Sequence, residues 1–304
     1  MAKTVLITGG TGLIGTALTK RLLAKGYEVA HLGRIRRALP HIKNYIWDIK
    51  NKTIEPGALE SADYIIHLAG AGVFDKPWTD AYKYEIIDSR VSSANILYDY
   101  IEKFNLKPKA FITASGVAVY GADTGENSIN ETTPSGPGFL AEVVHAWESA
   151  ADKFQNLGIR TVKLRTGIVL DKNGGALEKI VGPIKLGVGA PLGKGSQYIP
   201  WIHVDDLCEM YIWSIENENM KNIFNGVSPF PVSNKEFTTE AARILRKPLI
   251  LPNVHSFILK LYLGGERAEY ILGGNRIVNP KIELEGFKYK FPIIKSALHN
   301  LLLE

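Results

Sequence analysis

The chain has 304 residues, of which 45% are hydrophobic and 22% are charged, as is typical of a globular protein with one or two domains. The net charge of +5 suits a protein that binds an anionic cofactor, and no dense basic run or nucleic-acid motif accompanies it. The single cysteine, Cys208, excludes an internal disulfide and a cysteine-rich metal site, and no run of eighteen apolar residues is present. We therefore expect a cytoplasmic protein with no metal, no secretory signal, and neither a nucleic acid nor a membrane as partner.

The first predicted elements are a buried strand at residues 4–7, a glycine turn, a helix at 13–25 and a second strand at 28–32. Gly9, Gly12 and Gly15 have the spacing of a dinucleotide site, in which a diphosphate lies on the free N–H groups of the helix N-terminus. An ordinary turn between strand and helix is the alternative. The residues predicted to bind the cofactor at this turn are Gly9, Thr11, Gly12, Leu13, Ile14 and Gly15.

The end of the second strand indicates which dinucleotide is bound. A site for NAD places a carboxylate there, which accepts a hydrogen bond from the ribose 2′-OH, whereas this chain has Gly33 and Arg34. Because a guanidinium can hold a 2′-phosphate that a carboxylate would repel, the sequence predicts NADP(H) in preference to NAD(H), with Arg34 as the main contact. Arg36 and Arg37 are interpreted as solvated charges of the loop.

Strand and helix patterns continue to alternate through the first half of the chain. The further predicted elements are strands near 44–47, 62–70, 110–115 and 161–164, and helices at 83–104 and 139–157. This alternation predicts an α/β fold of the Rossmann type, with a doubly wound parallel sheet covered on both faces. Ligands of such sheets bind beyond the carboxyl ends of the strands. The candidate cofactor residues at or just past those ends are Asp48, Leu68, Ala69, Gly70, Ser115 and Arg165.

Arg90 lies on the predicted helix at 83–104 and is a further candidate for contact with a cofactor or substrate phosphate. A surface ion pair is the alternative for this residue. After Asp171 the chain becomes richer in glycine and less regular. We expect a dinucleotide-binding domain at 1–170, to which part of 199–225 returns, and a smaller, partly discontinuous substrate-facing domain at 171–304, with a loop at 186–201 that could close over a ligand.

Several motifs resemble those of the extended short-chain dehydrogenase/reductases, the group of nucleotide-sugar epimerases and dehydratases. Those motifs are the glycine turn at 8–15, His67-Leu68-Ala69-Gly70, Val119-Tyr120-Gly121 and Trp201-Ile202-His203-Val204-Asp205-Asp206. The segments at 165–170, 174–177, 197–203, 224–226, 231–237 and 285–292 are similar to one atypical subgroup, which is cell-division-inhibitor-like and has a C-terminal domain of unknown function. The resemblance covers essentially the whole chain. It implies a small-molecule substrate and a homodimer formed through two helices that include 83–104.

The chain departs from the parent superfamily at its proton relay, a Tyr-x-x-x-Lys pair on the helix after the fifth strand. None of the thirteen tyrosines has a lysine four residues later, and the matching positions are Leu140 and Val144. Ser115, Glu142 and His145 are the candidates to replace it. Glu142 and His145 have the alternative of being solvated residues on the helix surface.

Other polar residues of the motifs have structural interpretations. We expect His203 to form a structural hydrogen bond, Tyr120 to be a packing residue, and Asp205 and Asp206 to cap the following helix. Two functions remain open. The first is an NADP-dependent oxidoreductase or epimerase acting on an unidentified small substrate, such as a phosphorylated or nucleotide-linked one. The second is a catalytically silent NADP(H)-binding protein that reports the state of the cofactor to a partner.

Overall fold

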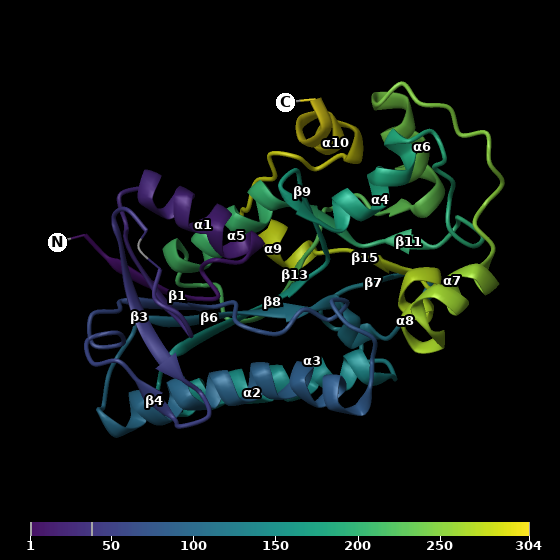
Figure 1. Ribbon diagram of the computed structural model, residues 1–304. Coiled ribbons are helices and arrows are strands. Elements are labelled where there is room, and N and C mark those ends of the chain that lie inside the picture. The colour runs from purple at the N-terminus through teal and green to yellow at the C-terminus, as the bar shows by residue number, and fades with distance from the viewer. Residues whose placement is uncertain (1, 38, 304) are drawn as a thin grey trace. The chain divides into compact units, whose positions relative to one another are not determined.

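The computed structural model describes residues 2–37 and 39–303 (Figure 1). Within these residues the largest feature is an eight-stranded sheet with the strand order β13-β8-β6-β5-β1-β2-β3-β4. Its strands are β1 (Thr4–Thr8), β2 (Glu28–Gly33), β3 (Ile42–Asp48), β4 (Thr53–Ile54), β5 (Tyr64–His67), β6 (Ala110–Gly116), β8 (Arg160–Thr166) and β13 (Asn222–Gly226).

The sheet is doubly wound about β1. Parallel pairs join β1 to β2, β2 to β3, β1 to β5 and β5 to β6, whereas β4 pairs antiparallel to β3. The chain thus builds outward from β1 through β2 and β3, then returns to add β5 and β6 on the other side. That reversal beside β1 is the switch point at which such folds bind ligands, and it confirms the predicted α/β fold of the Rossmann type.

The chain divides into two compact units. The first comprises the described residues up to Ser115, together with Val143–Leu164 and Cys208–Ile223. The second comprises Gly116–Glu142, Arg165–Leu207 and the described residues from Phe224 onward.

The first unit holds most of the large sheet, and helices cover both faces of it. These helices are α1 (Leu13–Ala24), α2 (Asp80–Lys103), most of α3 (Phe139–Asn156) and most of α5 (Val204–Glu216). Figure 1 shows α2 and α3 along one face and α1 and α5 on the other. Every residue of β1 and β5 is buried, as expected of parallel strands covered on both sides. In the core, Phe111 of β6 stacks on Phe154 of α3, with ring centroids 3.7 Å apart.

The second unit is built from short elements. They are a 3₁₀ helix (Val117–Tyr120), β7 (Gly125–Ile129), β9 (Ile168–Asp171), β10 (Gly174–Gly175), α4 (Ala176–Lys185), β11 (Tyr198–Ile199), β12 (Trp201–His203), β14 (Val232–Ser233), α6 (Asn234–Ile244), α7 (Ser256–Leu263), α8 (Gly265–Leu272), β15 (Asn275–Ile277), α9 (Pro280–Leu284) and α10 (Ile294–Leu303). Its strands pair in sets β10-β9-β12, β11-β14 and β15-β7. The core of this unit gathers Trp201, Phe237 and Leu298 from β12, α6 and α10.

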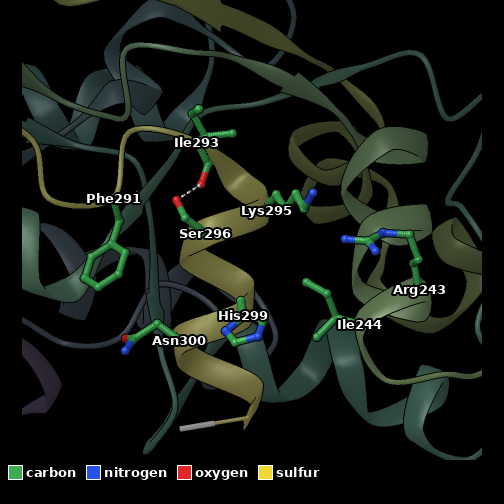
Figure 2. A pocket seen from close by; sticks show the side chains of 8 residues that line it. All are labelled: Arg243, Ile244, Phe291, Ile293, Lys295, Ser296, His299 and Asn300. Carbon is green, nitrogen blue, oxygen red and sulfur yellow. Dashed lines mark hydrogen bonds between the residues drawn. The ribbon is translucent and has the colours of Figure 1, made fainter.

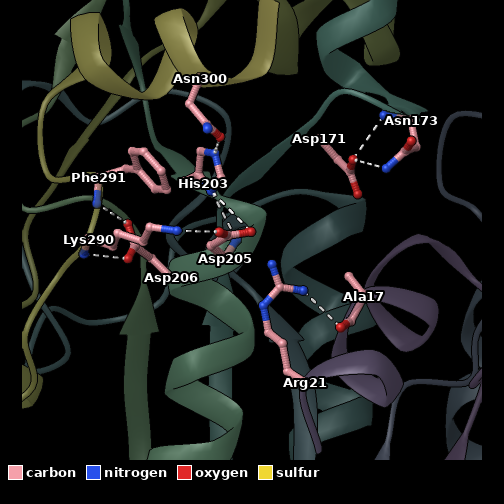
Figure 3. A network of polar contacts seen from close by, with 10 residues as sticks. All are labelled: Ala17, Arg21, Asp171, Asn173, His203, Asp205, Asp206, Lys290, Phe291 and Asn300. Carbon is pink, nitrogen blue, oxygen red and sulfur yellow. Dashed lines mark hydrogen bonds and ion pairs between the residues drawn. The ribbon is translucent and has the colours of Figure 1, made fainter. Parts of the chain in front are cut away.

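One predicted helix cap in this unit is wrong. The carboxylate of Asp206 accepts hydrogen bonds from the backbone N–H groups of Lys290, at 2.7 Å, and Phe291, at 2.9 Å (Figure 3). It therefore holds the segment before α10 and, among the described residues, accepts no hydrogen bond from an N–H group of α5. Among the described residues, no helix combines the length and the apolar character that crossing a membrane requires.

Candidate cofactor site

The glycine turn after β1 has a backbone that only glycine allows. Gly9 has φ 69°, and its carbonyl accepts the N–H of Gly12 at 3.0 Å. A Cβ on Gly15 would lie 2.4 Å from that same carbonyl oxygen, so a side chain there would displace the turn. Gly12 is the N-cap of α1, and no acidic side chain lies in the first turn of that helix. The turn therefore presents free backbone N–H groups to an anion.

A second loop lies against this turn, at the end of the neighbouring strand β5. The hydroxyl of Thr8 accepts hydrogen bonds from the N–H groups of Leu68 and Ala69, each at 3.2 Å. A Cβ on Gly9 would lie 3.0 Å from the N atom of Ala69, which shows how closely the two loops approach. Thr8 also bonds to Nδ1 of His67 at 2.8 Å, so one hydroxyl fixes the ends of both strands.

His67 is fully buried between these strands and α2. Its Nε2 bonds to the hydroxyl of Ser93 at 3.1 Å, and its ring stacks on Phe111. Burial lowers the pKa of His67 to about 4, so the ring is neutral at physiological pH. The motif containing His67 was found from the sequence, but the roles of Thr8 and His67 in joining the two loops were not.

Arg90 lies directly behind Gly70. A Cβ on Gly70 would be 3.1 Å from Cζ of Arg90, and the guanidinium lies 4.9 Å from the ring of Trp147. Arg90 is buried, and its Nη1 donates to the carbonyl of Ile86 at 2.8 Å. In the described part of the chain, its Nε has no hydrogen-bond partner and no carboxylate pairs with it. The alternative of a surface ion pair is therefore wrong.

Desolvation of this cation has a measurable cost. Burial lowers the pKa of Arg90 to about 10, because removing the charge from water disfavours the protonated form. A buried charge without a counter-charge is expensive, and an anionic ligand beside Gly70 would offset that cost. This side chain is thus an observation, independent of the glycine turn, that points to an anion at the same place.

The arginines after β2 have different surroundings. Arg34 follows Gly33 directly, is exposed, and has no ion pair or hydrogen bond among the residues that the structure describes. Arg36 instead binds both carboxylate oxygens of Glu55, at 2.8 and 2.7 Å, and donates to the carbonyl of Asn44. It is therefore ion-paired and not simply solvated, and Arg34 remains free to meet a ligand.

Four further residues were predicted to bind the cofactor at this edge of the sheet, and they differ in hydrogen bonding and exposure. The carboxylate of Asp48 accepts the backbone and side-chain N–H groups of Asn51, at 3.0 and 2.8 Å, which holds its pKa below the ordinary value. Thr11 is exposed beside the turn, whereas Leu13 and Ile14 are half-buried in the first turn of α1. The structure places all four in the first unit, as it does the glycines and Arg34.

Ser115 is the penultimate residue of β6 and is buried with a carboxylate. Its hydroxyl donates to Oε1 of Glu148 on α3 at 2.6 Å, and both side chains are less than a tenth exposed. The sequence indicated Ser115 but missed Glu148, because the two residues are separated by 33 positions and form no motif. This is a close pair of proton-exchanging groups in the first unit.

The other two catalytic candidates lie in a different environment. Glu142 and His145 are exposed on α3, whereas Leu140 and Val144, at the positions of the missing relay, are buried. The structure therefore gives neither Glu142 nor His145 the buried surroundings of Ser115 and Glu148.

Arg165 belongs to a polar network of the second unit. Its Nη1 donates to the hydroxyl of Tyr120 at 3.1 Å, and that hydroxyl donates to Oδ1 of Asn225 at 2.9 Å. The backbone N–H of Asn225 binds Glu131 at 2.8 Å. Tyr120 is therefore a hydrogen-bonding residue as well as a packing residue.

The second unit also contains an open pocket of about 410 Å³ between the end of α6 and α10 (Figure 2). Arg243, Lys295 and His299 line it together with apolar side chains such as Ile244. None of the residues predicted from the sequence lines this pocket. Nearby, His203 bonds through Nε2 to Asn300 at 3.1 Å, in keeping with its expected structural role (Figure 3).

Comparison with known proteins agrees with this arrangement. The NAD dependent epimerase/dehydratase family matches residues 5–225, which include the glycine turn, Arg90 and the Ser115–Glu148 pair. The chain belongs to that family. A second family, a domain of unknown function called DUF1731, matches residues 254–301 of this epimerase family member. Both findings confirm the resemblance stated from the motifs.

Relatives match along nearly the whole chain. The human epimerase family protein SDR39U1 is 33% identical over 98% of this chain and 99% of its own length. The epimerase family protein YfhF of Bacillus subtilis is 32% identical over 99% of this chain and 98% of its own. A crystal structure of human SDR39U1 (isoform 2) with NADPH has a TM-score of 0.87 and 31% identity, and covers 98% of both chains.

Proposed function

We propose that this protein is an NADP(H)-dependent oxidoreductase or epimerase that acts on a small molecule. The observation that carries the proposal is Arg90, a buried cation without a counter-charge behind Gly70, at the loop that lies against the glycine turn. The residues present fit a dinucleotide, because the close packing of the glycine turn leaves no room for a Cβ at Gly15, the first turn of α1 offers free N–H groups, and Arg90 supplies an unmatched positive charge.

Different parts of the site would bind different groups of the cofactor. The glycine turn and the first turn of α1 would hold the diphosphate, with Arg90 as a counter-charge beside Gly70. Arg34 would hold the 2′-phosphate, which favours NADP(H) over NAD(H). A relative that is 31% identical was crystallised with NADPH, which supports this preference. Gly33, Asp48, Leu68, Ala69 and Arg165 complete the proposed set.

NADP(H), when bound, supplies the hydride acceptor or donor. The protein must then exchange a proton with the substrate oxygen, and we assign that step to the buried Ser115–Glu148 pair. In an oxidation, the Ser115 hydroxyl would take the proton of the substrate hydroxyl as it gives its own proton to the Glu148 carboxylate. In a reduction, the two protons would return along the same path. Because Glu148 lies only 2.6 Å from the Ser115 hydroxyl, it can exchange the proton directly, and the serine does not have to remain deprotonated.

The proposal is tested by following NADPH oxidation over a panel of carbonyl compounds and nucleotide sugars. We expect turnover of at least one compound, and a fall in kcat of about a hundredfold in Glu148→Gln, because general acid–base catalysis contributes on this scale. Gln keeps a hydrogen-bond acceptor for Ser115, so the cofactor affinity and thermal stability of this variant should stay close to those of the wild type. Glu142→Gln is the matched control and should retain its turnover.

Unchanged turnover in Glu148→Gln would overturn the assignment of the proton step. Loss of stability without loss of kcat would show that the pair only anchors α3 to β6.

The second candidate function is a catalytically silent NADP(H)-binding protein. It is favoured by Leu140 and Val144, which are buried apolar residues at the positions of the family relay. Tight NADPH binding without turnover of any compound in the panel would favour it. The cytoplasmic location, the domain boundaries, the loop closure at 186–201 and the homodimer through α2 stay predictions.

A further inference from the structure

The eight-residue helix α7 has no buried residue. Four large apolar side chains on it are exposed, Phe257 at 67%, Ile258 at 56%, Leu261 at 78% and Tyr262 at 85%. At about 100° per residue these four positions fall within an arc of about 140°, so they form one continuous side of the helix. We call this set the α7 apolar face. Leu259 and Leu263 on the opposite side are half-buried, where α7 packs against α8.

Before the helix, Ile250 (76%) and Leu251 are also exposed. Single exposed leucines are common and need no explanation, but a contiguous cluster of this kind marks a surface that is covered in function. Burial of such side chains in an apolar environment is favourable, and the free protein does not gain this stabilisation. The α7 apolar face is therefore interpreted as a docking surface.

The charges of this segment indicate what covers it. Residues 246–272, which include α7 and α8, contain the four cations Arg246, Lys247, Lys260 and Arg267 and the two anions Glu266 and Glu269, so four minus two gives a formal charge of +2. Arg243 pairs with Glu240, whereas Arg246, Lys247 and Lys260 are exposed and, among the described residues, form no ion pair. An exposed apolar helix face flanked by an unpaired lysine, in a segment with an excess of cations, is typical of helices that lie in a lipid interface with anionic headgroups.

We propose that α7 docks on an anionic lipid surface, with the α7 apolar face among the acyl chains and Lys260 at the headgroups. A helix of eight residues is about 12 Å long, too short to cross a bilayer, so it would lie in the interface. This revises the expectation from the sequence that no membrane is a partner. The proposal is independent of the cofactor site.

A second copy of the chain is a less suitable occupant. A two-fold dimer formed through the α7 apolar face would bring together two copies of a segment whose formal charge is positive. Like charges at an interface oppose association, whereas anionic headgroups neutralise them.

Co-sedimentation of the whole protein with lipid vesicles tests this inference. One set of vesicles is phosphatidylcholine alone, and the other is an equimolar mixture of phosphatidylcholine and phosphatidylglycerol. We expect binding to the mixed vesicles, at least about tenfold weaker binding to phosphatidylcholine, and loss of binding at high salt. Leu261→Asp should reduce binding to the mixed vesicles about tenfold or more.

Leu284→Asp is the matched control, since Leu284 on α9 is an equally exposed leucine, at 87%. It should bind like the wild type. Lys260→Glu, an exposed change that leaves the α7 apolar face intact, should lose most of the preference for anionic vesicles, and thermal denaturation checks that each variant is folded.

Three results would overturn the proposal. They are absence of binding to any vesicle, equal loss in Leu261→Asp and Leu284→Asp, and a wild-type dimer in light scattering that Leu261→Asp abolishes while no vesicle binds. The last result would make a second copy the occupant.

Discussion

Arg34 and Arg36 are separated by a single residue, yet the structure gives them different roles. Glu55 neutralises Arg36, and Arg34 points from the end of β2 with no partner among the residues described. A sequence shows that arginines follow a strand, but it does not show which of them a distant glutamate will occupy. Arg34 was nonetheless identified correctly as the residue at the strand end, because that position follows from the fold.

We predict that Arg34→Ala weakens NADPH binding by about 1.5–3 kcal/mol, or about ten- to a hundredfold in Kd, because one charged contact to the 2′-phosphate is lost. Binding of NADH, which lacks that phosphate, should change little. Arg37→Ala, the removal of another exposed arginine from the same loop, is the control. Calorimetric titration of both cofactors decides the matter, and equal losses for NADPH and NADH would refute the assignment.

His67 links the stability of the first unit to pH. Its pKa falls from an ordinary 6.5 to about 4 on burial, so between these values the unfolded chain binds a proton that the folded chain does not. Stability is therefore full above the unfolded pKa and is lost as the pH falls towards the folded pKa.

From about pH 7 to about pH 5, this single group should lower the free energy of unfolding by about 2 kcal/mol. Urea denaturation at both pH values should show this loss in the wild type and a smaller loss in His67→Gln. His31, whose pKa is also lowered by burial, remains in both proteins and contributes equally to each. An identical pH dependence in the two proteins would contradict the prediction.

At the scale of elements, the glycine turn is the part most completely set by the sequence. Gly15→Ala should destabilise the protein by about 1–3 kcal/mol and weaken NADPH binding, because the new Cβ would meet the Gly9 carbonyl oxygen at 2.4 Å. Gly265→Ala at the start of α8 is the control. Nothing lies within 4 Å of its added Cβ, so little loss of stability is expected. Thermal unfolding compares the two, and an equally stable Gly15→Ala would contradict the tight packing.

The elements of the first unit were predicted well, and those of the second were not. α2 begins at Asp80 and not near 83, because Thr79 caps it by accepting the N–H of Tyr82. The strands β9 to β12 of the second unit have two to four residues, too few for a hydrophobic alternation to show. The Ser115–Glu148 pair could not be predicted for a related reason, since only the packing of α3 on the sheet brings these residues together.

At the scale of the whole molecule, the proposed cofactor contacts other than Arg165 lie within the first unit. Bound NADPH should therefore stabilise the chain by mass action, by about 2.7 kcal/mol at a concentration a hundred times its Kd. Differential scanning calorimetry of the intact protein would show this as a rise of several degrees in Tm. No shift in Tm at saturating NADPH would contradict a cofactor site in this unit.

The most direct test of the account is calorimetric titration of the purified wild-type protein with NADPH and with NADH. We predict one binding site per chain and a Kd for NADPH that is at least about tenfold lower than that for NADH, because Arg34 recognises only the 2′-phosphate. Equal affinities, or tighter binding of NADH, would contradict the role of Arg34, and absence of binding by either cofactor would contradict the site itself.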